Sequence, residues 1–129
     1  MGSKTNYLED KVLEHVLRNV AYTSPATVYL ALFTANPTDA AGGTEVTGGS
    51  YARQSIAFAA PSPSGTIKNS ALVTFPVASA DWGTITGFAI FDASTVGNML
   101  YWGALAASKS ILTADQIKFA ADSVVITED

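Results

Sequence analysis

The chain has 129 residues and a formal net charge of -4, with 14% charged and 48% hydrophobic residues. Its seven Lys and Arg residues are scattered singly, which argues against the clustered basic surface that binds nucleic acid. No run approaches the roughly 20 apolar residues of a membrane span, and no apolar segment near the N-terminus indicates export. The sequence contains no cysteine, which excludes disulfides and thiolate metal sites.

The first patterned segment is typical of an amphipathic helix. Apolar residues recur at helical spacing, at Leu8, Val12, Leu13, Val16, Leu17 and Val20. Asn6 followed by Glu9 forms a capping-box arrangement, and Thr23-Ser24-Pro25 is expected to end the helix. We therefore predict a helix over about residues 7–20. We expect its apolar stripe to pack on the chain's own core, with an interface to a partner as the alternative.

From residue 27 onward the pattern is typical of β-strands. Residues 27–33 are apolar at nearly every position, which predicts a strand covered on both faces. Residues 84–91 and 99–105 flank a polar connection and predict a β-hairpin. Further strands are predicted at 51–58, 71–77, 109–112, 116–119 and 123–127. The fold class is therefore mainly β: a β-sandwich or jelly-roll-like domain of about eight strands over residues 27–127, forming with the helix a single domain over residues 1–129.

A long polar loop is predicted between the first two strands, over residues 34–50. It contains Asn36-Pro37 and two Gly-Gly pairs, which are turn-forming residues. Its length exceeds that of most loops, and such loops are commonly functional. Asp39 and Glu45 carry oxygen ligands of the kind that calcium prefers, but their spacing lacks the regular alternation of known calcium loops. We therefore predict no metal site.

Few residues offer catalytic chemistry. His15, the single histidine, is expected on the solvated side of the helix, which leaves no base for a nucleophile. Asp81, Asp92, Asp115 and Asp122 fall at predicted strand ends and could pair for acid–base catalysis, but Asp at such positions more often caps a turn. We predict no catalytic residues, no enzyme activity, no cofactor and no small-molecule substrate.

Three aromatic residues lie close to the predicted hairpin: Trp82, Tyr101 and Trp102. Clustered aromatic side chains can bind a glycan or anchor a partner protein, and they can equally pack in a core. Tyr101 and Trp102 are adjacent and must point to opposite faces of a strand, so one of them can be exposed.

Five segments of the chain resemble a family of small virion proteins of tailed phages. They are Tyr29–Pro37, Gly48–Gln54, Phe75–Gly83, Gly87–Asp92 and Leu100–Leu105, and the resemblance covers nearly the whole chain. Members of the family are often labelled tail-fibre proteins, while similar small β-sandwich or jelly-roll proteins are cement or decoration proteins of capsids. The resemblance implies synthesis in a host cytoplasm and incorporation into a virion, and it supplies no catalytic residues.

Two features favour a capsid cement protein. The sequence has no sustained coiled coil or repeat of the kind fibres use, and its long loop and low charge suit many weak contacts acting together. We expect a protein of the capsid surface that binds the major capsid protein and itself, as a homodimer or homotrimer. The expected contact residues are Asn36, Asp39, Glu45, Tyr101 and Trp102.

Two other functions remain open from the sequence. The first is a tail or tail-fibre component that binds host glycan through exposed aromatics near Trp82 and Trp102. The second is a small hydrolase or lyase that uses Asp81 and Asp92 as a carboxylate pair.

Overall fold

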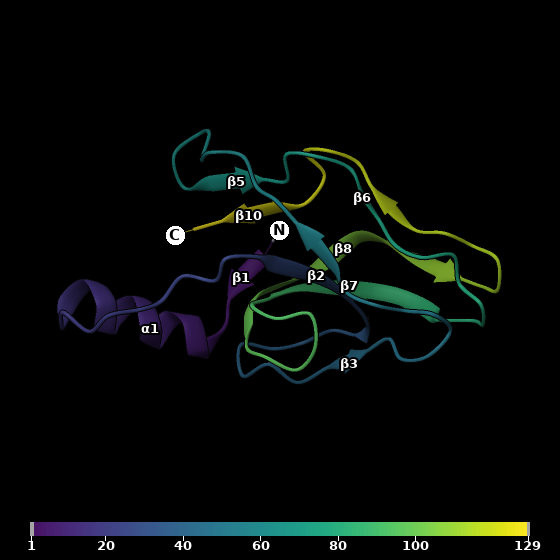
Figure 1. The fold of residues 1–129 in the computed structure, drawn as a ribbon, viewed down its shortest axis with the longest axis horizontal. Helices are drawn as coiled ribbons and strands as arrows, with labels where there is room; N and C mark the ends of the chain where they lie inside the picture. The colour runs from purple at the N-terminus through teal and green to yellow at the C-terminus, as the bar shows by residue number, and fades with distance from the viewer. Residues whose placement is uncertain (1, 129) are drawn as a thin grey trace.

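The computed structural model describes residues 2–128, which form ten strands and one helix near the N-terminus (Figure 1). In chain order the elements are β1 (Gly2–Lys4), α1 (Asn6–Leu17), β2 (Val28–Ala35), β3 (Thr44–Glu45), β4 (Gln54–Ile56), β5 (Thr66–Lys68), β6 (Val73–Thr74), β7 (Gly83–Phe91), β8 (Met99–Ile111), β9 (Lys118–Phe119) and β10 (Val125–Thr127). The predicted mainly β fold with an N-terminal helix is confirmed. No helix within the described residues is long and apolar enough to cross a membrane.

One bent sheet forms most of the body. Its strand order is β3-β2-β7-β8-β1-β10-β5, with β4 also paired to β2, while β6 and β9 form a separate two-stranded sheet. Strand β1 pairs antiparallel with β8 on one side and parallel with β10 on the other. The sheet therefore continues from β2, β7 and β8 into β10 and β5, which lie above those three strands in Figure 1. The main hydrophobic core fills the space between the two parts.

The central hairpin is the one predicted, but its second strand is longer. Strands β7 and β8 pair antiparallel around the 92–98 connection. A register shift between Ile85 and Gly87 accommodates extra residues of β8. Strand β8 therefore runs on to Ile111, and the separate strand predicted at 109–112 is its final part.

Strand β2 is covered on both faces, as predicted. Leu30 and Leu32 point into the main core. The opposite face carries a smaller cluster of Ala31, Phe33, Ala89, Phe91 and Met99, with Ala41 and Trp102 packed against it. The cover of this second face comes in part from the 36–46 segment through Ala41.

The helix ends differ from those predicted. The N-cap is Thr5, not Asn6: its hydroxyl accepts from the Leu8 N–H at 3.4 Å and donates to the Met99 carbonyl at 2.6 Å. The helix stops at Leu17 because Asn19 adopts a left-handed φ of 56°, a common conformation just after a helix end. The Val20 N–H bonds back to the Glu14 carbonyl. The stop expected at Thr23-Ser24-Pro25 is therefore wrong.

The apolar stripe of α1 faces solvent. Leu8 is its one buried member, while Leu17 is 74% exposed and Val16 is 67% exposed. Backbone hydrogen bonds from Thr5 and Asn6 to the carbonyls of Leu100 and Asp39 hold the start of the helix, and the remaining turns extend away from the β body (Figure 1). The expectation that the stripe packs on the chain's own core is therefore wrong.

Candidate functional site

The most elaborate polar cluster is centred on Arg53, whose side chain is only 8% exposed. Its guanidinium donates to both carboxylate oxygens of Glu45 at 2.9 Å. It also donates to the carbonyls of Ala93 and Val96 at 3.0 and 2.8 Å, and its centre lies 3.6 Å from the centroid of the Phe91 ring. One side chain thus joins β3 to the loop of the β7–β8 hairpin, which gives it a structural role.

This cluster stabilises an unusual loop tip. Val96 has a positive φ of 56° and is followed by Gly97 with a φ of 70°. A β-branched residue is strained in that region, yet the Val96 side chain is 84% exposed. The bond from Arg53 to the Val96 carbonyl and the bonds from Asn98 to Asp92 hold the tip in place.

The five predicted contact residues do not form one surface. Asp39 accepts from the Trp102 indole N–H at 3.0 Å, so the structure brings these two together. Asn36 accepts from the Thr86 hydroxyl at 2.8 Å, and Glu45 belongs to the Arg53 cluster. Tyr101 lies apart from Trp102, on the other face of β8, and donates to Glu128 at 2.8 Å. Both Tyr101 and Trp102 are half-buried.

The two tryptophans do not share an aromatic platform. Trp82 is only 5% exposed, donates to the Gly49 carbonyl at 2.8 Å and contacts the Tyr51 ring edge-on with centroids 5.4 Å apart. It belongs to the main core, whereas Trp102 packs against the second cluster on the opposite face. This arrangement agrees with core packing for Trp82 and gives no support to joint glycan binding by the pair.

The carboxylate pair considered for catalysis is separated by a whole strand. Asp81 precedes the nine-residue strand β7 and Asp92 follows it, so the two lie about 30 Å apart at the usual rise per residue. Glycosidase carboxylates stand about 5–10 Å apart. Asp81 instead accepts from Thr113, and Asp92 accepts from Asn98, which agrees with the turn-capping interpretation. Within residues 2–128, no three His, Asp or Glu residues lie close enough to hold a metal ion.

The hydroxyl groups of Tyr51 and Tyr101 are the most strongly perturbed among the tyrosines. Burial raises the pKa of Tyr51 well above its ordinary value of 10.0, and donation to Glu45 at 2.7 Å raises it further. Burial, followed by the hydrogen bond to Glu128, also raises the pKa of Tyr101. Both hydroxyls are therefore neutral donors at physiological pH.

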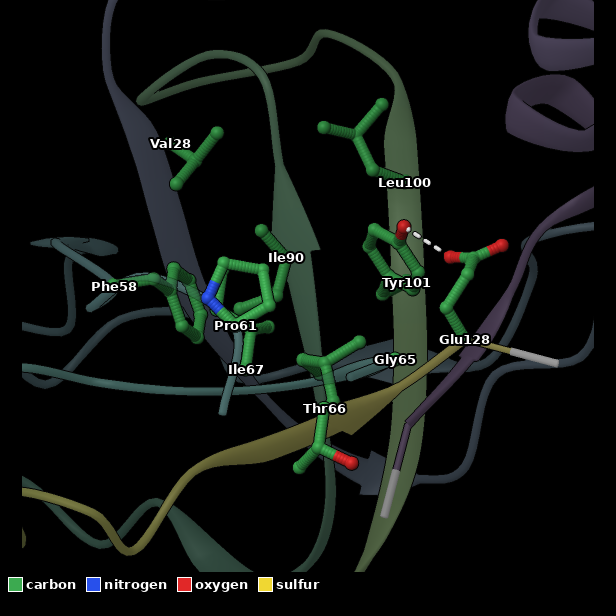
Figure 2. Close-up of a pocket in the computed structure, with 11 residues that line it drawn as sticks. Val28, Phe58, Pro61, Gly65, Thr66, Ile67, Ile90, Leu100, Tyr101 and Glu128 are labelled. Atoms are coloured by element: carbon green, nitrogen blue, oxygen red, sulfur yellow. Dashed lines mark hydrogen bonds between the residues drawn. The ribbon is translucent and has the colours of Figure 1, made fainter. Parts of the chain in front are cut away.

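An apolar cavity of about 400 Å³ lies between the two parts of the bent sheet. Buried Ile90, Leu100 and Ile126 contribute to its lining, and Figure 2 shows Phe58 and Ile67 facing Tyr101 and Glu128 across it. The dashed bond in Figure 2 joins the Tyr101 hydroxyl to Glu128 at one edge. Sequence patterns do not indicate this cavity because its walls come from β2, β5, β7, β8 and β10, which are far apart along the chain.

Comparison with protein families gives a match over residues 3–127 to the family described as Podophage GP4 fiber I protein gp80. The chain belongs to this family. The resemblance to phage virion proteins is thereby confirmed, and the protein is a structural component of a phage virion. A search of curated proteins finds no match.

Proposed function

We propose that this virion protein is a structural subunit of a phage fibre. The observation that carries the proposal is the family match, which spans nearly all of the chain and whose description names a fibre protein. The close-packed body is consistent with a structural role in the virion. Its largest polar cluster ties a loop to the sheet, and its buried Asn69 has all three of its side-chain hydrogen bonds directed at backbone groups.

In this function the protein acts by holding a shape and by making contacts, without a chemical reaction. Strand β2 is covered on both faces, and buried residues of β7 and β8 belong to both hydrophobic clusters, so this close-packed part of the sheet resists deformation. The exposed stripe of α1 and the strained tip at Val96 are the apolar surfaces that we propose contact neighbouring virion subunits.

Attachment to the capsid surface as a cement protein is the second candidate. It is favoured by the compact body of residues 2–128, in which the helix has 12 residues and no long coiled-coil shaft is present. Fibre shafts commonly rely on such sustained repeats. In this function the partners are the major capsid protein and further copies of the chain.

Localisation on the particle separates the two functions. Virions carrying this protein are labelled with a gold-conjugated antibody fragment and imaged by electron microscopy. The fibre function predicts label at the fibres and none over the shell. Label distributed evenly over the capsid contradicts it and favours the cement function.

A further inference from the structure

The exposed stripe of α1 has the spacing of a helix that inserts into a groove. Leu13, Val16 and Leu17 occupy positions i, i+3 and i+4 of the helix, Val20 follows the helix end, and all four are exposed. The three helical positions match the first three anchors of helix-in-groove recognition, which are spaced i, i+3 and i+4. A helix of this length is only marginally stable alone in water, and its apolar face adds nothing to stability while it faces solvent. The stripe therefore contributes to stability only when it packs against an apolar partner surface.

The cavity between the layers offers such a surface on the same chain. Its volume of about 400 Å³ falls in the range of roughly 300–1,000 Å³ typical of pockets that enclose a ligand. Of the side chains lining it, Thr66, Tyr101 and Glu128 are the polar ones. Water in contact with such a lining is unfavourable in proportion to the apolar area, so an apolar occupant stabilises it.

The chain's own helix is held away from this cavity. Thr5 and Asn6 fix the start of α1 by backbone bonds to Leu100 and Asp39, and Leu8 is buried at its base. These contacts fix the direction in which the remaining turns leave the body (Figure 1). Insertion into the chain's own cavity would break them, whereas insertion into the cavity of another copy leaves them intact.

Charge favours a second copy as well. Arg18 follows the last turn of α1, with a side chain 72% exposed and only a 3.6 Å contact to Glu14. Glu128 stands at the edge of the cavity and keeps 42% exposure despite its contacts with Lys4 and Tyr101. Seating the stripe in the cavity of another copy allows Arg18 to approach this carboxylate, and opposite charges attract at such a rim.

We propose that the stripe of α1 from one copy inserts into the apolar cavity of a second copy. The contact joins two different surfaces, so it is heterologous and produces a closed ring or a head-to-tail row of subunits. The inference concerns association of the purified protein, so its outcome does not depend on whether the protein resides in a fibre or on the capsid.

The first experiment compares the mass of the purified full chain and its variants by sedimentation across a range of concentrations. The double variant Leu13→Ser, Leu17→Ser is expected to weaken association by about 100-fold or more, since two anchors no longer bury apolar surface. The matched control is Leu72→Ser, Val77→Ser, which alters two exposed apolar residues outside the helix and is expected to leave association unchanged. A monomeric wild-type chain, or an oligomeric helix variant, overturns the proposal.

A mixing experiment then identifies the surface that receives the helix. Ile67→Trp fills part of the cavity. Pro61→Lys places a cation at the mouth of the cavity, where the side chain is exposed and its replacement leaves the core intact. Each variant is expected to be monomeric. Mixed with the helix variant, either is expected to form a complex, because one partner supplies an intact helix and the other an intact cavity. Association of both cavity variants alone points to helix–helix pairing and overturns the proposal, as does the absence of any complex in the mixture.

Discussion

Replacing Arg53 tests whether the buried ion pair holds the hairpin loop to the body. Arg53→Lys keeps the charge but loses the two-pronged contact with Glu45, the stack on Phe91 and at least one bond to the loop carbonyls. Hydrogen bonds to charged groups contribute about 1.5–3 kcal/mol each, and stranding one member of a buried pair costs about 3–5 kcal/mol. We expect Arg53→Lys to lower the free energy of unfolding by about 2–4 kcal/mol.

The assay is urea unfolding of a double-mutant cycle. Arg53→Met and Glu45→Gln are each expected to lower the free energy of unfolding strongly. The double variant is expected to lose less than the sum of the two single losses, which gives a coupling energy of about 2 kcal/mol or more. The matched control is the exposed pair of Arg18 and Glu14, 3.6 Å apart, whose coupling is expected to be below about 0.5 kcal/mol. A coupling between Arg53 and Glu45 no larger than that of the control refutes the assigned role.

Three further predictions concern Asn69, Tyr51 and Trp82, and each is measured by urea unfolding. Asn69→Ala removes the three hydrogen bonds of a buried side chain and is expected to lower the free energy of unfolding by about 2–4 kcal/mol. Asn98→Ala, at an exposed site, is expected to lower it by less than about 1 kcal/mol. Equal losses contradict this reasoning. The raised pKa of Tyr51 keeps this residue protonated in the folded state, while in the unfolded chain it loses its proton above pH 10. Its contribution to stability is therefore full below pH 10 and falls above it by up to about 1.4 kcal/mol per pH unit, in addition to the loss from Tyr101. Tyr51→Phe is expected to make the slope of stability against pH less steep, and an unchanged slope contradicts the assignment. Trp82→Ala is expected to cost about 3–5 kcal/mol and Trp102→Ala clearly less, because Trp102 is half-buried; the reverse order contradicts the placement of Trp82 in the main core.

The fold class and the central hairpin could be predicted because they depend on local pattern. Apolar residues on both sides of 27–33 indicated a strand covered on both faces, and β2 is such a strand. Strands β1, β3 and β5 have two or three residues each, too few for any periodicity to emerge. Strand β1 forms only through partners about 100 residues or more away along the chain, and it lies between β8 and β10 in the sheet.

Polarity alone does not show whether a predicted contact residue is free or already bonded within the chain. Asn36 and Asp39 follow β2, Glu45 ends β3, and each is hydrogen-bonded by the chain's own groups; that they contact a partner stays a prediction. The apolar stripe of α1 has the same spacing whether it faces a core or solvent, so its exposure depended on how the first turn is tied to β8. The one sequence signal for the Arg53 cluster is that Arg53 is the single charged residue in the strand predicted over residues 51–58.

The central claim, that this protein is a structural subunit of a fibre, is tested most directly by its copy number relative to the major capsid protein in purified virions. Quantitative mass spectrometry with labelled reference peptides from both proteins measures this ratio. The fibre function predicts that the protein is present in the particle at a small fraction of the capsid protein's copies. A ratio close to that of the capsid protein contradicts the fibre function and favours capsid cement, and absence from purified particles contradicts a structural role in the virion.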